Sequence, residues 1–271
     1  MATARRRPAR RSRTWQPLLY AYCALVFAFL TAPMVVVAIV SFSSASYLVF
    51  PPPGFSLRWY ARYLNDPIWI DATVRSFKVG LVATAISTVL GTLLAFSLVR
   101  GRYPGRAIID RLSIAPLIVP SMVYSIAVYG LFASLRLIGS WPTIALAHAV
   151  HILPYVVLIV VAALKTFDVA QEQAAMGLGA TRLGAILRVT LPQIRPALVS
   201  AAFLAFISSF DELVIAMFLG GAQMTLPKKM FDNIMTEIDP TIAAVSVLQI
   251  VLVAIALGLA SRFGAGVKPV A

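Results

Sequence analysis

Long apolar segments alternate with short polar ones along the chain. Each apolar segment is long enough for an α-helix to cross the core of a bilayer, which takes about 20 residues. The pattern predicts an all-α integral membrane protein with six transmembrane helices. The predicted spans are Leu18–Ile39, Thr73–Val99, Ile108–Leu135 (interrupted by Pro116 and Pro120), Pro142–Leu164, Ala197–Leu219 and Thr241–Ala260.

The segments between these spans complete the predicted organisation. The loop after the first span is rich in Trp and Tyr, which favour the headgroup level and predict a short interfacial helix there, and residues 220–240 are predicted to form a polar loop. The chain divides into a basic tail (1–17), a first transmembrane helix (18–42), an external loop (43–72), a domain of five helices with a cytoplasmic loop at 166–195 (73–263), and a short cytoplasmic tail (264–271).

Composition favours a membrane protein over a soluble domain. Hydrophobic residues make up 60% of the chain, charged residues 12%, and the mean hydropathy is +0.89, which is far from the averages of soluble proteins. The single cysteine, Cys23, lies in an apolar segment, so neither a disulfide framework nor a cysteine metal site is available. No phosphate-binding loop of the form G-x-x-x-x-G-K-S/T occurs, so if transport is driven by ATP we expect another chain to bind the nucleotide.

The position of the basic residues predicts the topology. Of the 23 Lys and Arg residues, 16 fall on one side of the predicted spans, and the positive-inside rule assigns that side to the cytoplasm. Six spans then place both termini there. A secretory or twin-arginine signal peptide is the alternative for the N-terminal arginines, but the apolar stretch after them exceeds the roughly 7–15 residues of a signal core. The cytoplasmic set is Arg5, Arg6, Arg7, Arg10, Arg11, Arg13, Arg100, Arg102, Arg106, Arg111, Lys165, Arg182, Arg188, Arg195, Arg262 and Lys268.

A polar, arginine-bearing stretch, Gln171–Pro196, separates the fourth span from the fifth. Asp168 and Gln171 have the spacing of a capping box, which predicts the start of a short helix. Gly177 and Gly179 predict a reversal of the chain at its end, because glycine readily adopts positive φ.

The second half of this stretch, Thr181–Thr190, repeats apolar residues at about one helical turn. We expect Pro192 to end this second helix and Pro196 to lie in the first turn of the next one. The two halves together predict a compact helix–turn–helix that lies against the membrane without crossing it.

This stretch resembles the EAA loop of ABC-type importer permeases, whose pattern is E-A-A, three residues, G, nine residues and I-x-L-P. The matching segments are Gln173-Ala174-Ala175, Gly179 and Val189-Thr190-Leu191-Pro192. Gln173 replaces the Glu, with Glu172 beside it, and Val189 replaces the Ile. The resemblance implies a coupling helix that docks on a cytoplasmic ATPase, and the alternative is an ordinary amphipathic loop. The implied coupling residues are Glu172, Gln173, Ala174, Ala175, Gly179, Leu191 and Pro192.

Later segments indicate a particular group within the importer permeases. Ser209–Leu213, Thr225–Pro227 and Glu237–Ser246 are similar to permeases of the spermidine/putrescine group, and the likeness runs from about residue 73 onward. It implies the type I ABC importer transmembrane fold, a location in a bacterial inner membrane and uptake of a polyamine or a related small solute.

The same resemblance implies the partners of the chain. They are a dimer of cytoplasmic ABC ATPase subunits, a second permease subunit that is homologous but not identical, an extracytoplasmic substrate-binding protein and membrane lipid. ATP hydrolysis is assigned to the ATPase, so no catalytic residue, cofactor, metal or nucleic acid is expected for this chain.

Two adjacent carboxylates, Asp211 and Glu212, fall within the predicted fifth span. A charged side chain at mid-bilayer costs on the order of 2.5–3.5 kcal/mol, so such residues usually face protein or water and carry function. Ser208 is spaced to donate a hydrogen bond to them, and Phe210 lies on a helical stripe with Phe206. That stripe is favoured as a packing face over a cation–π track. The candidates for the substrate path are therefore Ser208, Phe210, Asp211 and Glu212.

Two roles stay open for these acids. They can line the path of a cation, which would relieve the repulsion between them, or they can make structural contacts with the partner permease or with Lys228 and Lys229. A different class of function is also open, an ion-coupled secondary transporter that uses Asp211 and Glu212 as a relay. The lack of a recognisable inverted repeat in the sequence counts against it.

The two histidines, His148 and His151, share one face of the fourth span at i, i+3. No third ligand and no acid lie near them in the sequence. We therefore expect hydrogen-bonded packing residues here, in preference to a metal site or a nucleophile–His–acid arrangement.

Overall fold

The computed structural model describes residues 15–264, and the regular secondary structure in that part of the chain is helical, as predicted. Most of the predicted N-terminal tail, with its arginines, and Lys268 lie outside the described residues. The elements are α1 (Gln16–Val40), α2 (Arg58–Asn65), α3 (Pro67–Arg100), α4 (Arg106–Ile118), α5 (Ser121–Ser134), α6 (Trp141–Thr166), α7 (Val169–Gly177), α8 (Arg182–Ala185), the π-helical η1 (Ile186–Thr190), α9 (Leu191–Phe210), α10 (Val214–Leu219), α11 (Leu226–Thr236) and α12 (Thr241–Gly264).

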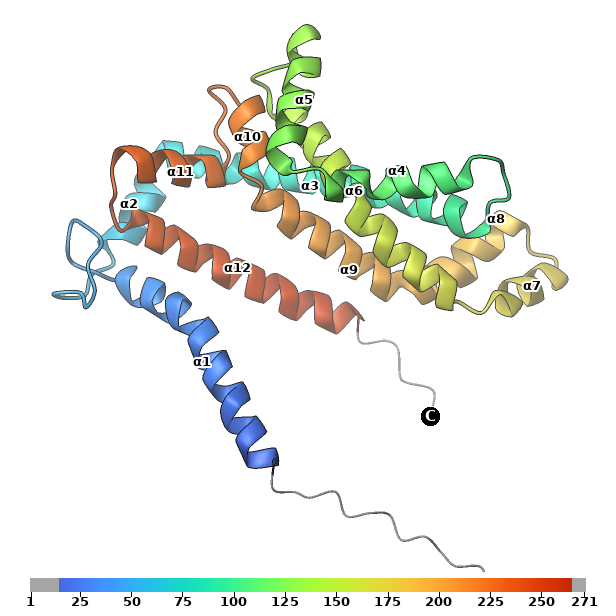
Figure 1. The fold of residues 1–271 in the computed structure, drawn as a ribbon, viewed down its shortest axis with the longest axis horizontal. Coiled ribbons are helices and arrows are strands. Elements are labelled where there is room, and N and C mark those ends of the chain that lie inside the picture. The colour runs from blue at the N-terminus through green and yellow to red at the C-terminus, as the bar shows by residue number, and fades with distance from the viewer. Residues whose placement is uncertain (1–14, 265–271) are drawn as a thin grey trace, which may run out of the picture.

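Three long helices, α3, α6 and α9, pack against one another and form the core of the bundle (Figure 1). Small residues on α3 let the helix backbones approach closely, as is common in membrane proteins. A Cβ atom on Gly91 would lie 2.8 Å from Cγ1 of Val156 on α6, and one on Gly80 would lie 3.0 Å from Cε2 of Phe206 on α9. The close packing of the core therefore depends on these two glycines.

Five helices are long and apolar enough to cross a membrane, and six spans result if α4 and α5 count together as one. These two helices are bent by 106° at their break, so the predicted third span is not a single helix. Pro120 is the cause, because the residue before a proline is driven out of the α region. Val119 is accordingly extended, with ψ 126°, whereas Pro116 remains inside α4.

The second span starts earlier than predicted, at Pro67 instead of Thr73. Asp66 caps α3 by accepting a hydrogen bond from the amide of Ile68 at 2.8 Å, and proline is well suited to the first turn that follows. The short helix predicted after the first span is present as α2. The stretch predicted as a polar loop at 220–240 contains a further helix, α11.

The predicted fifth span, Ala197–Leu219, is wrong at both ends. One helix runs from Arg182 through α8, η1 and α9 to Phe210. Residues 211–213 then separate it from the short α10. The two carboxylates therefore lie just beyond the end of a span and not in its middle.

Pro192 does not end the helix before it, contrary to prediction. A proline ring normally clashes with the carbonyl four residues earlier. Here the preceding turn is the wider π-helical η1, in which the amide of Leu191 donates to the carbonyl of Ile186, five residues back. The wider turn offsets the carbonyls by one residue, so the helix continues through the proline.

The first helix, α1, stands apart from the bundle (Figure 1). It contacts α12 near its own C-terminal end, and its other end lies away from the remaining helices. In the most apolar 18-residue stretch of α1, only 6% of the residues are buried. The apolar side chains of α1 are therefore available to lipid or to another protein chain.

We predict that Gly91→Ala lowers the thermal stability of the purified protein in detergent. The added methyl group would meet Val156 at 2.8 Å, and extra volume in a packed interface typically costs about 1–3 kcal/mol. Gly130→Ala on α5 is the matched control, because nothing lies within 4 Å of its Cβ position. Equal melting temperatures for the two variants would contradict the close approach of α3 and α6.

Candidate functional site

The polar stretch between α6 and α9 folds as a helix, a reversal and a second helical segment, and we call residues 168–190 the hairpin. Asp168 caps α7 by accepting a hydrogen bond from the amide of Ala170 at 3.0 Å. The capping box is incomplete, because the side-chain carbonyl of Gln171 accepts a hydrogen bond from Gln193 on α9. Gln171 therefore joins the hairpin to the following span.

The reversal after α7 is centred on Gly179, as predicted. Its φ is +93°, a conformation that strains residues with a side chain. Its amide donates to the carbonyl of Met176 at 3.0 Å, and the amide of Ala180 donates to the carbonyl of Ala175 at 3.1 Å, which is the bonding of a Schellman motif. The backbone conformation is what requires glycine, since nothing lies within 4 Å of the Cβ position.

Glu172 is the buried side chain of α7. Its carboxylate is 3% exposed and forms an ion pair with Arg100 at the end of α3. It also accepts a hydrogen bond from the hydroxyl of Thr190 at 3.1 Å. The guanidinium of Arg100 lies over the rings of Phe96 and Phe167, at 5.4 and 5.6 Å. One carboxylate thus joins α7, α3 and η1.

The other side chains around the end of α7 are open to solvent or to a partner. Gln173 and Ala174 are exposed, and Leu178 is 90% exposed. Glu172 therefore points into the protein, while Gln173, which occupies the motif position, lies on the surface. Leu191 and Pro192 lie at the start of α9, beyond η1.

Glu212 accepts backbone hydrogen bonds through one of its carboxylate oxygens, and the other oxygen lies near a histidine. Oε1 accepts hydrogen bonds from the amides of Val214 and Ile215, at 2.9 and 3.2 Å, and so caps α10. Oε2 lies 3.8 Å from Nε2 of His151 on α6. The ring of Tyr124 on α5 lies 5.2 Å from the ring of His151. Glu212 therefore caps α10 and places the segment after α9 next to α6.

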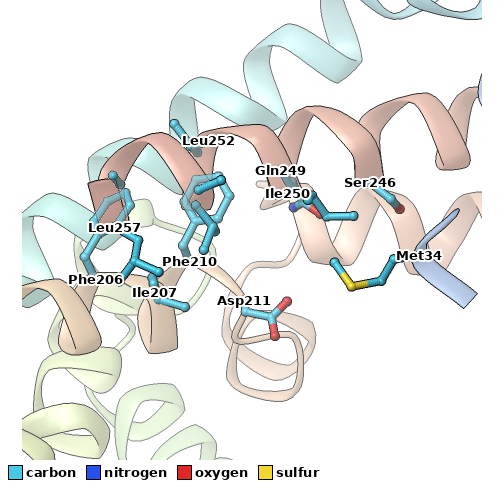
Figure 2. A pocket seen from close by; sticks show the side chains of 13 residues that line it. Met34, Phe206, Ile207, Phe210, Asp211, Ser246, Gln249, Ile250, Leu252 and Leu257 are labelled. Carbon is cyan, nitrogen blue, oxygen red and sulfur yellow. The ribbon is translucent and has the colours of Figure 1, made fainter. Parts of the chain in front are cut away.

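Asp211 has a different environment from its neighbour. Its carboxylate makes no hydrogen bond or ion pair with any residue between 15 and 264. It lines a cavity of about 500 Å³ between α1, α9 and α12 (Figure 2), with Phe206 and Phe210 on the α9 side and Gln249 on the α12 side. The two adjacent acids do not share one site, because Glu212 supports the fold and Asp211 faces the cavity.

The contacts proposed between these acids and the two lysines are not formed. Lys228 lies 2.7 Å from Asp232, and Lys229 lies over the ring of Trp69 at 5.2 Å, so the lysines as partners were a wrong prediction. Ser208 makes no hydrogen bond to either carboxylate in the described part of the chain.

The aromatic stripe on α9 is a packing face, as favoured from the sequence. Phe210 lies 5.1 Å from Phe77 on α3 and 5.6 Å from Phe206, measured between ring centroids. Both α9 rings also line the cavity beside Asp211. They therefore give the cavity an apolar wall next to its carboxylate.

His148 is a buried packing residue, as expected. It is 1% exposed, and its Nδ1 lies 2.9 Å from the hydroxyl of Ser209. His151 differs from the expectation, because the fold brings Glu212 next to it. Sequence spacing could not identify that acid, nor Arg100 as the partner of Glu172, because each pair lies far apart along the chain.

These features define a multi-pass membrane protein, with apolar spans, a polar hairpin at one end and an acid that faces a cavity just beyond the end of α9. Comparison with known proteins identifies the family. Residues 87–268 match the binding-protein-dependent transport system inner membrane components, and the chain belongs to that family.

Individual relatives agree with this assignment. The chain is 38% identical over 232 residues to the putrescine transport system permease protein PotI of Escherichia coli (strain K12), covering 83% of this chain and 82% of that protein. It is 30% identical over 234 residues to the spermidine/putrescine transport system permease protein PotC of Haemophilus influenzae, covering 86% and 90%.

The fold is also similar to a solved structure, that of a bacterial ABC transporter involved in the import of the acidic polysaccharide alginate. The TM-score is 0.72 at 17% sequence identity, and the match covers 94% of this chain and 99% of the other. The predicted importer permease fold is thereby confirmed.

We predict that Glu172→Gln loosens the hairpin. The change leaves the partly buried Arg100 without its ion pair, and about 3–5 kcal/mol, the cost of breaking a fully buried pair from one side, is the upper limit of the effect. Amide hydrogen exchange in α7 should therefore rise by roughly tenfold or more, because exchange reports local opening.

Two further variants test the cause. Gln173→Ala alters an exposed neighbour and should leave exchange unchanged. The double variant Arg100→Met with Glu172→Met removes both charges and should restore most of the protection. Unchanged exchange in Glu172→Gln would show that the ion pair does not hold the hairpin.

Proposed function

We propose that this chain is a membrane subunit of an ATP-driven importer for a polyamine or a related small cation. Membership of the family supports the importer role, and the names of the two relatives above support the substrate class. The observation that carries the proposal is Asp211, an unpaired carboxylate at a cavity lined by Phe206 and Phe210. A cation with apolar methylene segments matches both the charge and the aromatic wall.

ATP hydrolysis belongs in this proposal to a separate pair of ATPase subunits, because the sequence contains no phosphate-binding loop. The exposed face of α7, with Gln173, Ala174 and Leu178, is the surface that we assign to the ATPase. The remaining partners are a second, homologous but non-identical permease and an extracytoplasmic substrate-binding protein. The distribution of Lys and Arg supports a cytoplasmic location of the hairpin and of both termini.

Two connections carry movement of the ATPase into the membrane. The ion pair of Glu172 with Arg100 ties α7 to the end of α3. The helix from Arg182 to Phe210 runs from the hairpin to the edge of the Asp211 cavity. Displacement of the hairpin therefore moves the cavity wall, and the cavity opens alternately to the two sides of the membrane.

An ion-coupled secondary transporter gains no support from these observations. Its relay required both acids, but Glu212 is engaged by α10 and lies next to His151. Only Asp211 remains available, and the membership of the family favours an importer driven by ATP.

We predict that Gly179→Val uncouples ATP hydrolysis from uptake. A side chain at φ +93° is strained by about 1–2 kcal/mol, so the reversal after α7 should shift. Uptake by the assembled complex in proteoliposomes should fall by roughly tenfold, while ATP hydrolysis persists. The control is Gly177→Ala, at a helical glycine with nothing within 4 Å of its Cβ position. Normal uptake and normal hydrolysis in Gly179→Val would remove the coupling role from the hairpin.

The two acids give a second, paired prediction. Asp211→Asn should reduce uptake of putrescine or spermidine by roughly tenfold, the effect of losing about 1.4 kcal/mol of cation stabilisation, with an unchanged melting temperature. Glu212→Gln should lower the melting temperature instead, because it weakens the cap of α10 and the contact with His151. Full uptake in Asp211→Asn would move that acid to a purely structural role.

A further inference from the structure

A basic cavity lies beside the hairpin, separate from the Asp211 cavity. Its volume is about 610 Å³, within the range of about 300–1,000 Å³ typical of small-molecule sites. It lies between the turn from α3 to α4, helix α7 and the start of α8, which meet at one end of the bundle (Figure 1). Its charged lining residues are Arg100, Arg102, Arg106, Arg182 and Glu172. Gln173 also lines it, so the cavity adjoins the surface that we assign to the ATPase.

The positive charge of this cavity is not neutralised by the protein. Its one acid is paired with Arg100. No acid in residues 15–264 forms an ion pair with Arg102, Arg106 or Arg182. Arg100 itself has spare donors, since its Nε and Nη2 atoms are buried without a hydrogen-bond partner. The cavity thus holds an excess of positive charge and lacks an acceptor for buried donors.

The start of α4 adds a second and independent feature. Arg106 is the first residue of this 13-residue helix, whose first turn contains no acid and whose N-cap makes no side-chain hydrogen bond. The N-terminus of a helix carries partial positive charge, so a cationic side chain there is unfavourable. An anion between the helix end and the arginine removes that conflict.

One face of α4 next to the cavity is apolar, which distinguishes a lipid from a free anion, and the exposed Asp110 and Arg111 lie on the other faces of the helix. Ile108 and Leu112 follow Arg106 on α4, and each is 64% exposed. α4 is also the first half of the bent helix pair that counts as a sixth span when its two helices are taken together, so the cavity lies at the end of an apolar segment. Basic pockets between transmembrane helices at this level suit phospholipid headgroups. A free anion would leave the apolar surface unused.

We propose that this cavity binds the phosphate headgroup of an anionic phospholipid, with its acyl chains along α4. Arg102 and Arg106 from the α3–α4 turn and Arg182 from the hairpin contact the phosphate, and the spare donors of Arg100 complete the site. The bound lipid bridges the turn and the hairpin. This inference is independent of the transported substrate.

Lipid titration of the purified full-length chain tests the proposal. Native mass spectrometry would compare phosphatidylglycerol with phosphatidylcholine of identical acyl chains. The wild-type protein should bind phosphatidylglycerol at least roughly tenfold more tightly, and Arg102→Gln combined with Arg106→Gln should abolish that preference. Arg188→Gln, at the same end of the bundle but outside the cavity lining, should retain it. Arg102→Lys with Arg106→Lys should retain most of it, which separates lost charge from misfolding.

Three results would overturn the proposal. Equal binding of the two lipids by the wild-type chain would do so without any variant. Displacement of bound phosphatidylglycerol by millimolar inorganic phosphate would identify a site for free anions. A double Gln variant that keeps its lipid preference but no longer co-purifies with the ATPase would identify a protein interface. That last result would leave the proposed importer function standing.

Discussion

A buried carboxylate must be matched by a cation and by hydrogen-bond donors, because removing it from water otherwise costs several kcal/mol. Glu172 meets this condition with the guanidinium of Arg100 and the hydroxyl of Thr190. Its position decides which face of α7 is turned inward. Because Glu172 is turned inward, Gln173 and Leu178 are left exposed. The orientation of the hairpin thus follows from the pairing of one side chain.

The ends of the spans are determined by a few residues that interrupt the backbone hydrogen bonding. Pro120 forces the extended conformation of Val119 and produces the sharp bend between α4 and α5. Asp211 and Glu212 follow the end of α9, where Glu212 then caps α10. In both places a long apolar segment divides into two helices with different directions. The polar cluster of Glu212 and His151 and the Asp211 cavity both adjoin one such division.

Local signals explain which features could be predicted from the sequence. The apolar spans, the cap at Asp168 and the reversal at Gly179 each depend on residues within a few positions of one another, so a reading of the pattern identifies them. The Asp66–Pro67 start of α3 was equally local, but hydropathy alone placed the boundary later. The resemblance to the EAA loop identified the family before any contact was known.

The remaining features depend on contacts between distant segments. Arg100 is separated from Glu172 by α4, α5 and α6, and it was interpreted only as a marker of topology. The different roles of Asp211 and Glu212 could not be separated, because they arise from the directions of two neighbouring side chains. Pro192 was interpreted as a helix end because the turn before it was assumed to be α-helical, and it is not.

That π turn has a geometric consequence for the span that follows. It amounts to one residue inserted into an α-helix, and one residue corresponds to a rotation of about 100° around the helix axis. The π turn at Ile186–Thr190 therefore determines which side of α9 faces α12, although the turn lies well before the α9 residues that line the cavity. A homologous chain with the same α9 residues but a regular α-turn there would present a different side of the helix to that cavity.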